Sequence, residues 1–289
     1  MKSCLMSALI VVAMPILVAQ RGGPPAPAGP TPRLADGTPN LGRAPGEKGV
    51  WGVPWIRNMG LRIDKADAAN DLAASRGRGG LIGHIPGRDG SRFEPRVPFM
   101  PWSAAVYDYH VKNESKYDPE GYCLPPGGPR MMATPYPMEI IQLPDQKRIV
   151  MTFEGATHVW REIYVDGRSH PQGDALNPTY LGHSIGHWEG ETLVVDVVGF
   201  NEGTWLDYSG HPHTDLLHVV EKFTRRDKNT LHYEATIDDP GAYTKPWTVA
   251  WNIPWRANAE LTEYICQENN QYLNNLTDDF GKPLFGKKP

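Results

Sequence analysis

The second half of the chain is a succession of short runs rich in Val, Ile, Thr, Tyr and Trp, and this pattern constrains the fold more than any other feature. Turn residues such as Pro-Asp, Asp-Gly and Glu-Gly separate the runs. Because no helical crossover lies between them, successive runs are expected to pair as antiparallel hairpins. We predict strands over 138–143, 148–154, 158–165, 182–188, 192–200, 216–225, 230–237, 247–253 and 261–266.

A meander of this length exposes two unpaired edges unless its ends meet. Closure into a barrel removes both edges. The predicted fold is therefore mainly β, an antiparallel up-and-down meander that closes into a calycin-like or lipocalin-like barrel over residues 138–267. A β-sandwich of two packed sheets also satisfies the pattern and is the alternative.

The residues before and after the barrel have a different composition. Residues 21–49 are rich in Pro and Gly and predict a linker or an extended arm lying on the domain. Residues 50–137 are expected to be irregular and to pack on the barrel, with short helices over 62–75 and 102–116. Residues 268–289 form a polar tail.

The N-terminus has the pattern of a secretory signal. Lys2 precedes an apolar run over 5–19, which is too short to span a bilayer, so residues 1–20 are predicted to be a signal peptide. No later apolar run is long enough for a membrane span, and we expect a secreted or periplasmic protein. The formal charge of −4 and the absence of a Lys/Arg block argue against nucleic-acid binding.

Two cysteines follow the signal, Cys123 and Cys266. Because an exported protein meets an oxidising compartment, we predict a disulfide between them that ties the middle of the chain to its end. Two buried free thiols are the alternative.

Polar groups with catalytic potential are concentrated in residues 180–215. A general base at His187 or His211, oriented by Asp207 or Asp215, would suit a hydrolase or lyase acting on a carbohydrate or an aromatic compound. The sequence contains no phosphate-binding glycine-rich loop, so no nucleotide cofactor is expected.

Several predicted strands place one polar side chain among large apolar ones on the same face. Such a face suits the wall of a pocket for a small, partly apolar molecule, and a secreted barrel that binds such a ligand is the function we favour. The opposite assignment, in which these side chains meet solvent, stays open. The candidate ligand-binding residues are Trp160, Glu162, Tyr164, His183, Glu221, Tyr233 and Trp251, with Asn201 and Trp205 from the loop over 200–215.

A third possibility is a metal-binding module. His211 and His213 form a His-x-His core that zinc or copper accepts. His183 and His187 cannot join one metal as neighbours, because four residues of strand separate their Cα atoms by roughly 13 Å. In the alternative, the role of these histidines is structural, and they form hydrogen bonds with loop carbonyls and carboxylates.

Asp196 interrupts the otherwise apolar strand over 192–200. If this strand is central, a buried carboxylate there needs a partner. Arg161, from a neighbouring predicted strand, is the expected partner in an internal ion pair.

Several long motifs resemble an abundant family of secreted proteins from environmental bacteria. They include PTPRLADGTPNL, CLPPGGPR, IYVDGRSHP, GHSIGHWEGETLVVDVVGFN, W-L-D-x-S-G-H-P-H and DDPGAYTKPWTV. The resemblance covers nearly the whole mature chain. It implies export and a single domain, and because the family has no established activity it implies no catalytic residue.

Overall fold

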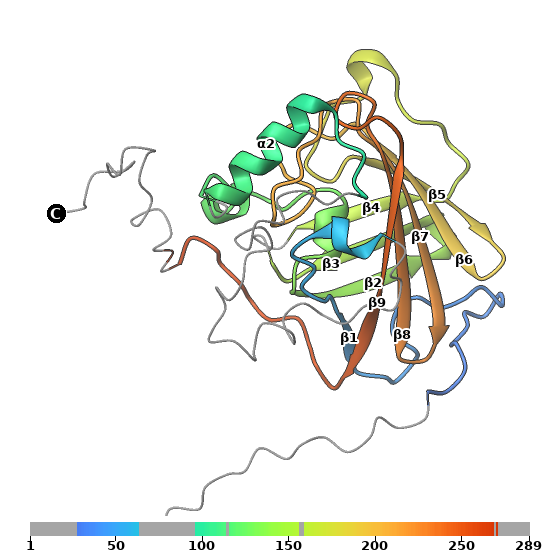
Figure 1. Cartoon of the computed structure of the whole chain (residues 1–289). Helices are drawn as coiled ribbons and strands as arrows, with labels where there is room; N and C mark the ends of the chain where they lie inside the picture. The colour runs from blue at the N-terminus through green and yellow to red at the C-terminus, as the bar shows by residue number, and fades with distance from the viewer. Residues whose placement is uncertain (1–27, 64–95, 114–115, 156–158, 269, 271–289) are drawn as a thin grey trace, which may run out of the picture.

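The computed structural model describes residues 28–63, 96–113, 116–155, 159–268 and 270. Nine strands form one closed barrel, which confirms the mainly β fold and the barrel (Figure 1). In chain order the strands are β1 (Gly49–Gly52), β2 (Pro137–Leu143), β3 (Arg148–Phe153), β4 (Trp160–Tyr164), β5 (His183–Glu189), β6 (Thr192–Val198), β7 (His218–Asp227), β8 (Thr230–Asp238) and β9 (Trp247–Ala257).

Strand β1 closes the barrel. Trp51 pairs with Met138 of β2 on one side and with Trp255 of β9 on the other, so β1 covers the edges that both strands would otherwise expose. The strand predicted over 261–266 is wrong. Those residues are irregular.

One pair of neighbouring strands departs from the expected antiparallel meander. Strands β4 and β5 run parallel, with Ile163 opposite Ser184 and Tyr164 opposite Ile185. Parallel neighbours cannot be joined by a tight hairpin, because the chain must return to the starting end of the sheet. Residues 165–182, which we call the crossover, make this return and project beyond the barrel at the top of Figure 1.

The helix expected over 102–116 is present as α2 (Pro101–Lys112), which begins with a proline at its first turn. The helix expected over 62–75 falls almost entirely outside the described residues. None of the helices in the described part of the chain is long and apolar enough to cross a membrane. The short 3-10 helices are η1 (Met59–Arg62), η2 (Pro119–Tyr122), η3 (Pro129–Met132), η4 (Pro144–Gln146) and η5 (Gly173–Ala175).

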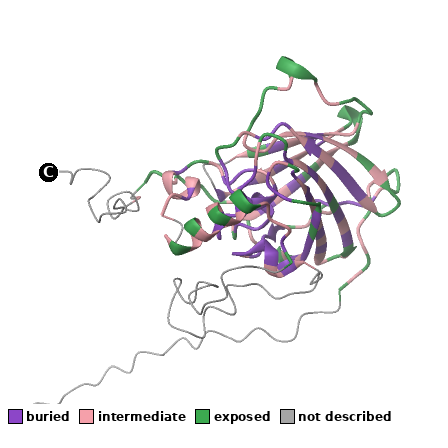
Figure 2. Ribbon diagram, turned by 45° about the horizontal axis from the view of Figure 1, so that its top comes forward, coloured by how far each residue is buried: buried purple, intermediate pink, exposed green. Residues whose placement is uncertain are grey.

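Burial alternates along the strands, as Figure 2 shows. In β8 the side chains of Leu231, Tyr233, Ala235 and Ile237 are completely buried, and the residues between them are only partly so. Inward residues of every strand except β5 meet Met131 and Met132 of η3 in one hydrophobic core, and the partly buried Trp188 of β5 packs against it. The interior is therefore packed with side chains around these methionines.

A polar network crosses this interior. Arg161 of β4 forms an ion pair with Glu221 of β7, and its Nε donates to Oγ of Ser184 at 2.9 Å. The hydroxyl of Tyr233 donates to the other oxygen of Glu221 at 2.7 Å. The expected pairing of Arg161 with Asp196 was wrong. Val195 and Val197 take the inward positions of β6, so Asp196 between them points outward.

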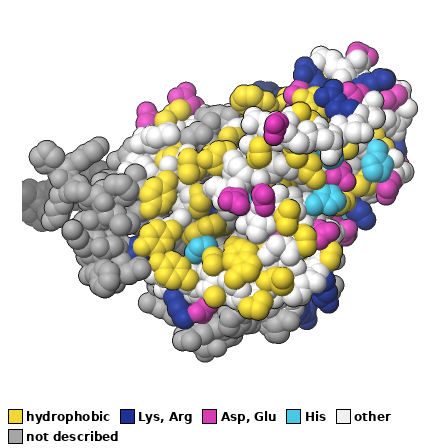
Figure 3. Space-filling model, turned by 90° about the horizontal axis from the view of Figure 1, so that it is seen from above, with side chains coloured by type: hydrophobic (Ala, Val, Ile, Leu, Met, Phe, Trp, Pro, Cys, Tyr) yellow, Lys and Arg dark blue, Asp and Glu magenta, His cyan; other side chains and the backbone are white. Residues whose placement is uncertain are grey.

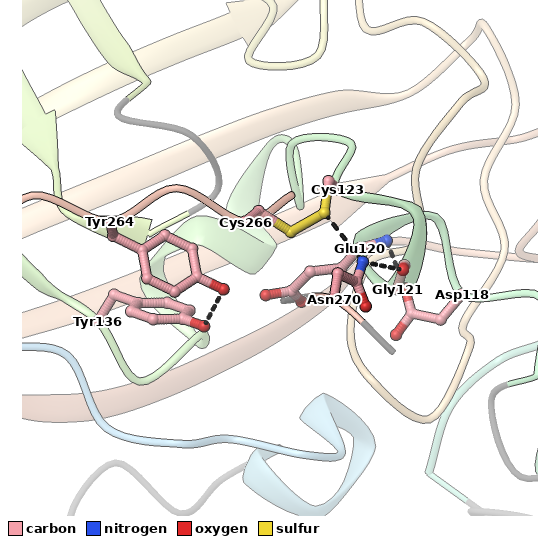
Figure 4. Close-up of a disulfide and its surroundings, with 8 residues drawn as sticks. All are labelled: Asp118, Glu120, Gly121, Cys123, Tyr136, Tyr264, Cys266 and Asn270. Atoms are coloured by element: carbon pink, nitrogen blue, oxygen red, sulfur yellow. Dashed lines mark hydrogen bonds between the residues drawn. A yellow bond between two sulfur atoms is a disulfide. The ribbon is translucent and has the colours of Figure 1, made fainter. Parts of the chain in front are cut away.

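The predicted disulfide joins Cys123 to Cys266, with 5.5 Å between their Cα atoms (Figure 4). Cys123 follows η2, and Cys266 lies beyond the last strand. The Tyr136 and Tyr264 hydroxyls lie 3.1 Å apart nearby. This attachment holds the chain after β9 against the side of the domain without a further strand.

Candidate functional site

A cleft of about 520 Å³ lies where the crossover meets the outer face of β4 and the start of β5. The parallel pairing produces it, because the crossover has to pass along the outside of the barrel before β5 begins. Large side chains supply most of its wall. They are Val159 and Trp160 at the start of β4, Tyr164 at its end, and Leu176, Tyr180 and Leu181 of the crossover.

Trp160 is the most exposed large hydrophobic residue of the described chain, at 66% of its full surface. An aromatic ring left open to solvent beside a concave surface is the kind of group that a ligand can cover. Figure 3 views the molecule from above relative to Figure 1. On this face hydrophobic side chains lie beside acidic and histidine side chains.

Glu162 and Tyr164 are already engaged with each other at this cleft. The tyrosine hydroxyl donates to Oε2 of Glu162 at 3.0 Å, and Arg148 of β3 forms an ion pair with Oε1. Burial and the bond to Glu162 raise the pKa of Tyr164. The Arg168 guanidinium carbon lies 3.7 Å from the centre of the Tyr164 ring. The wall on this side is thus a fixed aromatic surface.

Arg161 and Ser184 also line the cleft, although both are buried and belong to the interior polar network. Strands β4 and β5 are paired at only two positions, so the cleft reaches between them toward that network. Its floor is therefore polar while its walls are mainly apolar, which is the usual composition of a small-molecule site.

A chain of histidines and one carboxylate leads away from the cleft. Nδ1 of His183 lies 2.8 Å from Nδ1 of His170, and Nε2 of His170 lies 3.0 Å from Oδ1 of Asp196. Nε2 of His218 lies 3.1 Å from the same oxygen. Burial lowers the pKa of His183, and the charges of His170 and Arg168 lower it further. We call these four residues the histidine relay.

Four of the predicted ligand-binding residues line this one cleft, namely Trp160, Glu162, Tyr164 and His183. They do so on the outer face of the barrel and not in its lumen. The sequence left both face assignments of β4 open, and the structure has Arg161 and Ile163 in the inward positions. Glu221, Tyr233 and Trp251 do point inward, but they are completely packed in the core.

The remaining two ligand candidates lie in the loop after β6. Trp205 stacks on His110 of α2, with 3.9 Å between ring centres, and is buried by that contact. The side chain of Asn201 accepts a hydrogen bond from the Gly203 amide within the loop. Neither residue lines the cleft.

His211 and Asp207 form the predicted histidine–carboxylate pair, with 2.7 Å between Nδ1 and Oδ2. Both side chains are completely buried. Phe99 stacks on the His211 ring, and the Tyr107 ring lies tilted against it with 4.4 Å between centres. Burial alone would raise the pKa of Asp207, but the charge of His211 and hydrogen bonds from it and from the Met59 amide lower the pKa overall.

The catalytic set proposed from the sequence is not assembled. His187 lies on the surface beside Glu189, and Asp215 is an exposed residue outside the His211–Asp207 pair. A general base has to reach its substrate. The enclosed pair therefore acts as a structural anchor, which fixes the loop after β6 against η1 through Met59.

Residues that sequence analysis missed are His170 and His218. His170 lies in the IYVDGRSHP motif, which was singled out for resemblance alone, and its pairing with His183 depends on the path of the crossover. His218 opens β7 two residues before Val220, the register partner of Asp196 of β6, and recognising the outward face of Asp196 would have identified it.

The proposed metal pair also makes other contacts. Nε2 of His213 lies 2.8 Å from the Thr204 hydroxyl, and its Nδ1 bonds to the Thr214 carbonyl. His211 is bonded to Asp207. Within the described residues, no three His, Cys, Asp or Glu side chains are arranged to hold a metal ion. These contacts correspond to the structural alternative, in which the histidines form hydrogen bonds that organise the loop.

A scan against protein-family models finds no match for this chain. Searches of curated proteins and of solved structures also find none. The resemblance to a family of secreted bacterial proteins therefore stays a prediction, and the functional argument depends on the geometry of the cleft.

Proposed function

We propose that the protein binds a small, partly apolar molecule in the cleft between β4, β5 and the crossover. The observation that carries this proposal is the convergence of an exposed Trp160, a fixed Tyr164 and a polar floor on one concavity of about 520 Å³. Sites of a few hundred cubic ångströms with apolar walls and a few placed polar groups accommodate drug-sized ligands.

Ligand-observed NMR with a library of small aromatic and alicyclic compounds tests this proposal. Replacing Ala175, a small exposed residue of the crossover that lines the cleft, by Trp fills the space without disturbing the core. We expect compounds that bind the native protein to lose binding in Ala175→Trp. Leu216→Trp is the matched control, because Leu216 is an exposed side chain away from the cleft. Binding that survives Ala175→Trp would place the ligand elsewhere and end the proposal.

We also propose that the chain is exported and works outside the cytoplasm. The Cys123–Cys266 disulfide supports this location, because disulfides persist in oxidising compartments. Mass spectrometry of the protein recovered from a periplasmic extract should show a chain that begins near residue 21, with two hydrogens fewer than the reduced form. Recovery of the full-length chain with free thiols from the cytoplasm alone would contradict the proposal.

A further inference from the structure

The contacts of the histidine relay determine which nitrogen atoms carry protons. Asp196 has one oxygen within 3.1 Å of two imidazole nitrogens, Nε2 of His170 and Nε2 of His218. An ionised carboxylate only accepts hydrogen bonds, so both nitrogens must donate to it. Asp196 therefore fixes the tautomer of His170, with its proton on Nε2.

In neutral His170 the other nitrogen, Nδ1, then carries a lone pair and accepts. Its partner at 2.8 Å is Nδ1 of His183, which must donate. The lone pair of His183 is left on Nε2. No residue of the described chain forms a hydrogen bond with this atom, and the His183 side chain lines the cleft.

The other polar side chains beside it already form hydrogen bonds with one another. The Tyr164 hydroxyl donates to Glu162, and Ser184 accepts from Arg161. The Tyr164 ring stacks on the His183 ring with 5.6 Å between centres, and the hydrogen bond to His170 orients the imidazole. The cleft thus presents a fixed acceptor next to an aromatic wall.

We propose that the cleft recognises an apolar or aromatic molecule carrying a hydroxyl group, and that this hydroxyl donates its hydrogen bond to Nε2 of His183. This inference rests on the proposed binding function and names the chemistry of the ligand. His170 and Asp196 act as positioning residues, since they hold the tautomer of His183 without touching the ligand.

The relay also makes the preference depend on pH. The titratable and charged groups that face His183 and His170 are Tyr164 and Glu162 of β4, Arg168 of the crossover, Asp196 of β6 and His218 of β7. His170 lies between two groups that can accept, the Asp196 carboxylate and Nδ1 of His183, so the contacts of a protonated His170 are satisfied at both nitrogens. Both nitrogens of His170 then donate, Nδ1 of His183 becomes the acceptor, and Nε2 of His183 carries the proton. The cleft then offers a donor in place of an acceptor.

Nitrogen-15 NMR of the histidine side chains tests the tautomer in the full mature protein without any ligand. At pH 7.5 we expect His183 to show a protonated Nδ1 and an unprotonated Nε2, with the opposite tautomer for His170. On acidification the His183 signals should exchange to the tautomer protonated at Nε2. A His183 that is protonated at Nε2 at pH 7.5 would overturn the inference.

Calorimetric titration with two matched probes, 2-naphthol and 2-methoxynaphthalene, tests the ligand chemistry, because the methyl ether lacks the hydroxyl donor. At pH 7.5 we expect 2-naphthol to bind about fivefold more tightly, the usual effect of one neutral hydrogen bond. His183→Phe keeps an aromatic ring and should make the two affinities equal. His187→Phe, an exposed histidine further along β5, should preserve the difference.

The outcomes separate the two proposals. Equal binding of both probes to the native protein would contradict the hydroxyl preference. It would not contradict the proposed binding function. Failure of both probes to bind counts against the apolar cleft itself, and the NMR result still decides the tautomer. If His183→Phe does not fold, as judged by circular dichroism, the loss of preference on acidification of the native protein serves as the deciding measurement.

Discussion

Arg161 of β4 reaches across the barrel interior to Glu221 of β7, although β5 and β6 separate these strands in the sheet. Both side chains are at most 5% exposed. Arg161 also forms part of the floor of the cleft. The ion pair therefore links the packing of the core to the candidate binding site.

Removing one member of this pair should be strongly destabilising. Glu221→Gln leaves the Arg161 charge buried without its counter-charge, and we expect a loss of about 3–5 kcal/mol in the free energy of unfolding. The double substitution Arg161→Met with Glu221→Leu should lose less than the sum of the two single changes, because no buried charge is left. Urea denaturation measures Glu221→Gln, the single variants Arg161→Met and Glu221→Leu, and the double variant. The control is Arg33→Met, whose ion pair with Glu191 is about half exposed and should contribute less than about 1 kcal/mol.

The Cys123–Cys266 disulfide closes a loop with a sequence separation of 143 residues. The chain-entropy argument gives such a bond up to about 5 kcal/mol of stabilisation, with about 2–4 kcal/mol the usual range. We expect the Cys123→Ser, Cys266→Ser double variant to lose that amount in the free energy of unfolding. It should therefore unfold at a lower urea concentration. Reduction of the native protein with dithiothreitol should reproduce the shift and should leave the double variant unchanged. An unchanged midpoint after both treatments would show that the bond adds nothing.

The sequence predicts the barrel well, because eight of its nine strands are runs of five residues or more with β-branched and aromatic content. It misses β1, whose four residues lie between glycines and prolines and carry no periodicity. Only the edges of β2 and β9 make this segment a strand. The parallel pairing of β4 and β5 is likewise decided by the route of the crossover and not by either strand.

Part of the composition of the candidate site was predicted, but the face of each strand that carries it was left open. In β4 the two faces each carry aromatic or aliphatic groups together with a charge, so the period-two pattern alone cannot choose between them. Glu221, far away in the chain, decides the choice by pairing with Arg161 inside the barrel. The relay was missed for a similar reason, since His170 reaches His183 only through the folded crossover.

Arg225 holds the N-terminal arm to the barrel. Its Nη1 donates to the carbonyls of Asn40 and Gly42, each at 2.7 Å, and its guanidinium carbon lies 4.9 Å from the Trp51 ring centre. Burial lowers the pKa of Arg225 to about 10, so the group is still charged at neutral pH. Arg225→Met should destabilise the fold by about 1.5–3 kcal/mol, the range for hydrogen bonds to a charged group.

The same variant should expose the arm before the barrel unfolds. Hydrogen exchange of the amides of Asn40 and Gly42 is expected to accelerate far more than exchange in β8. Arg43→Met is the matched control, because Arg43 lies on the arm itself but makes a half-exposed ion pair with Glu139. Equal acceleration in the two variants would mean that the arm is held by its backbone contacts alone.

His213 should make the protein less stable in mild acid. Its side chain is buried between Thr204 and Thr214, and burial lowers its pKa below the usual value of 6.5. In the unfolded chain this histidine takes up a proton near pH 6.5, whereas in the folded chain it does so only at a lower pH. Acid therefore favours the unfolded state, and the free energy of unfolding should fall as the pH drops below about 6.5.

His213→Gln removes this titration and should flatten the decline, even if the variant is less stable at neutral pH through a weaker bond to Thr204. Urea denaturation at a series of pH values from 7.5 to 5 measures the slope. His187→Gln provides the comparison, because His187 is exposed beside Glu189 and should leave the slope as it is. If His213→Gln keeps the full slope of the native protein, the acid sensitivity originates in other groups, and the histidine relay would be the next to test with His170→Gln.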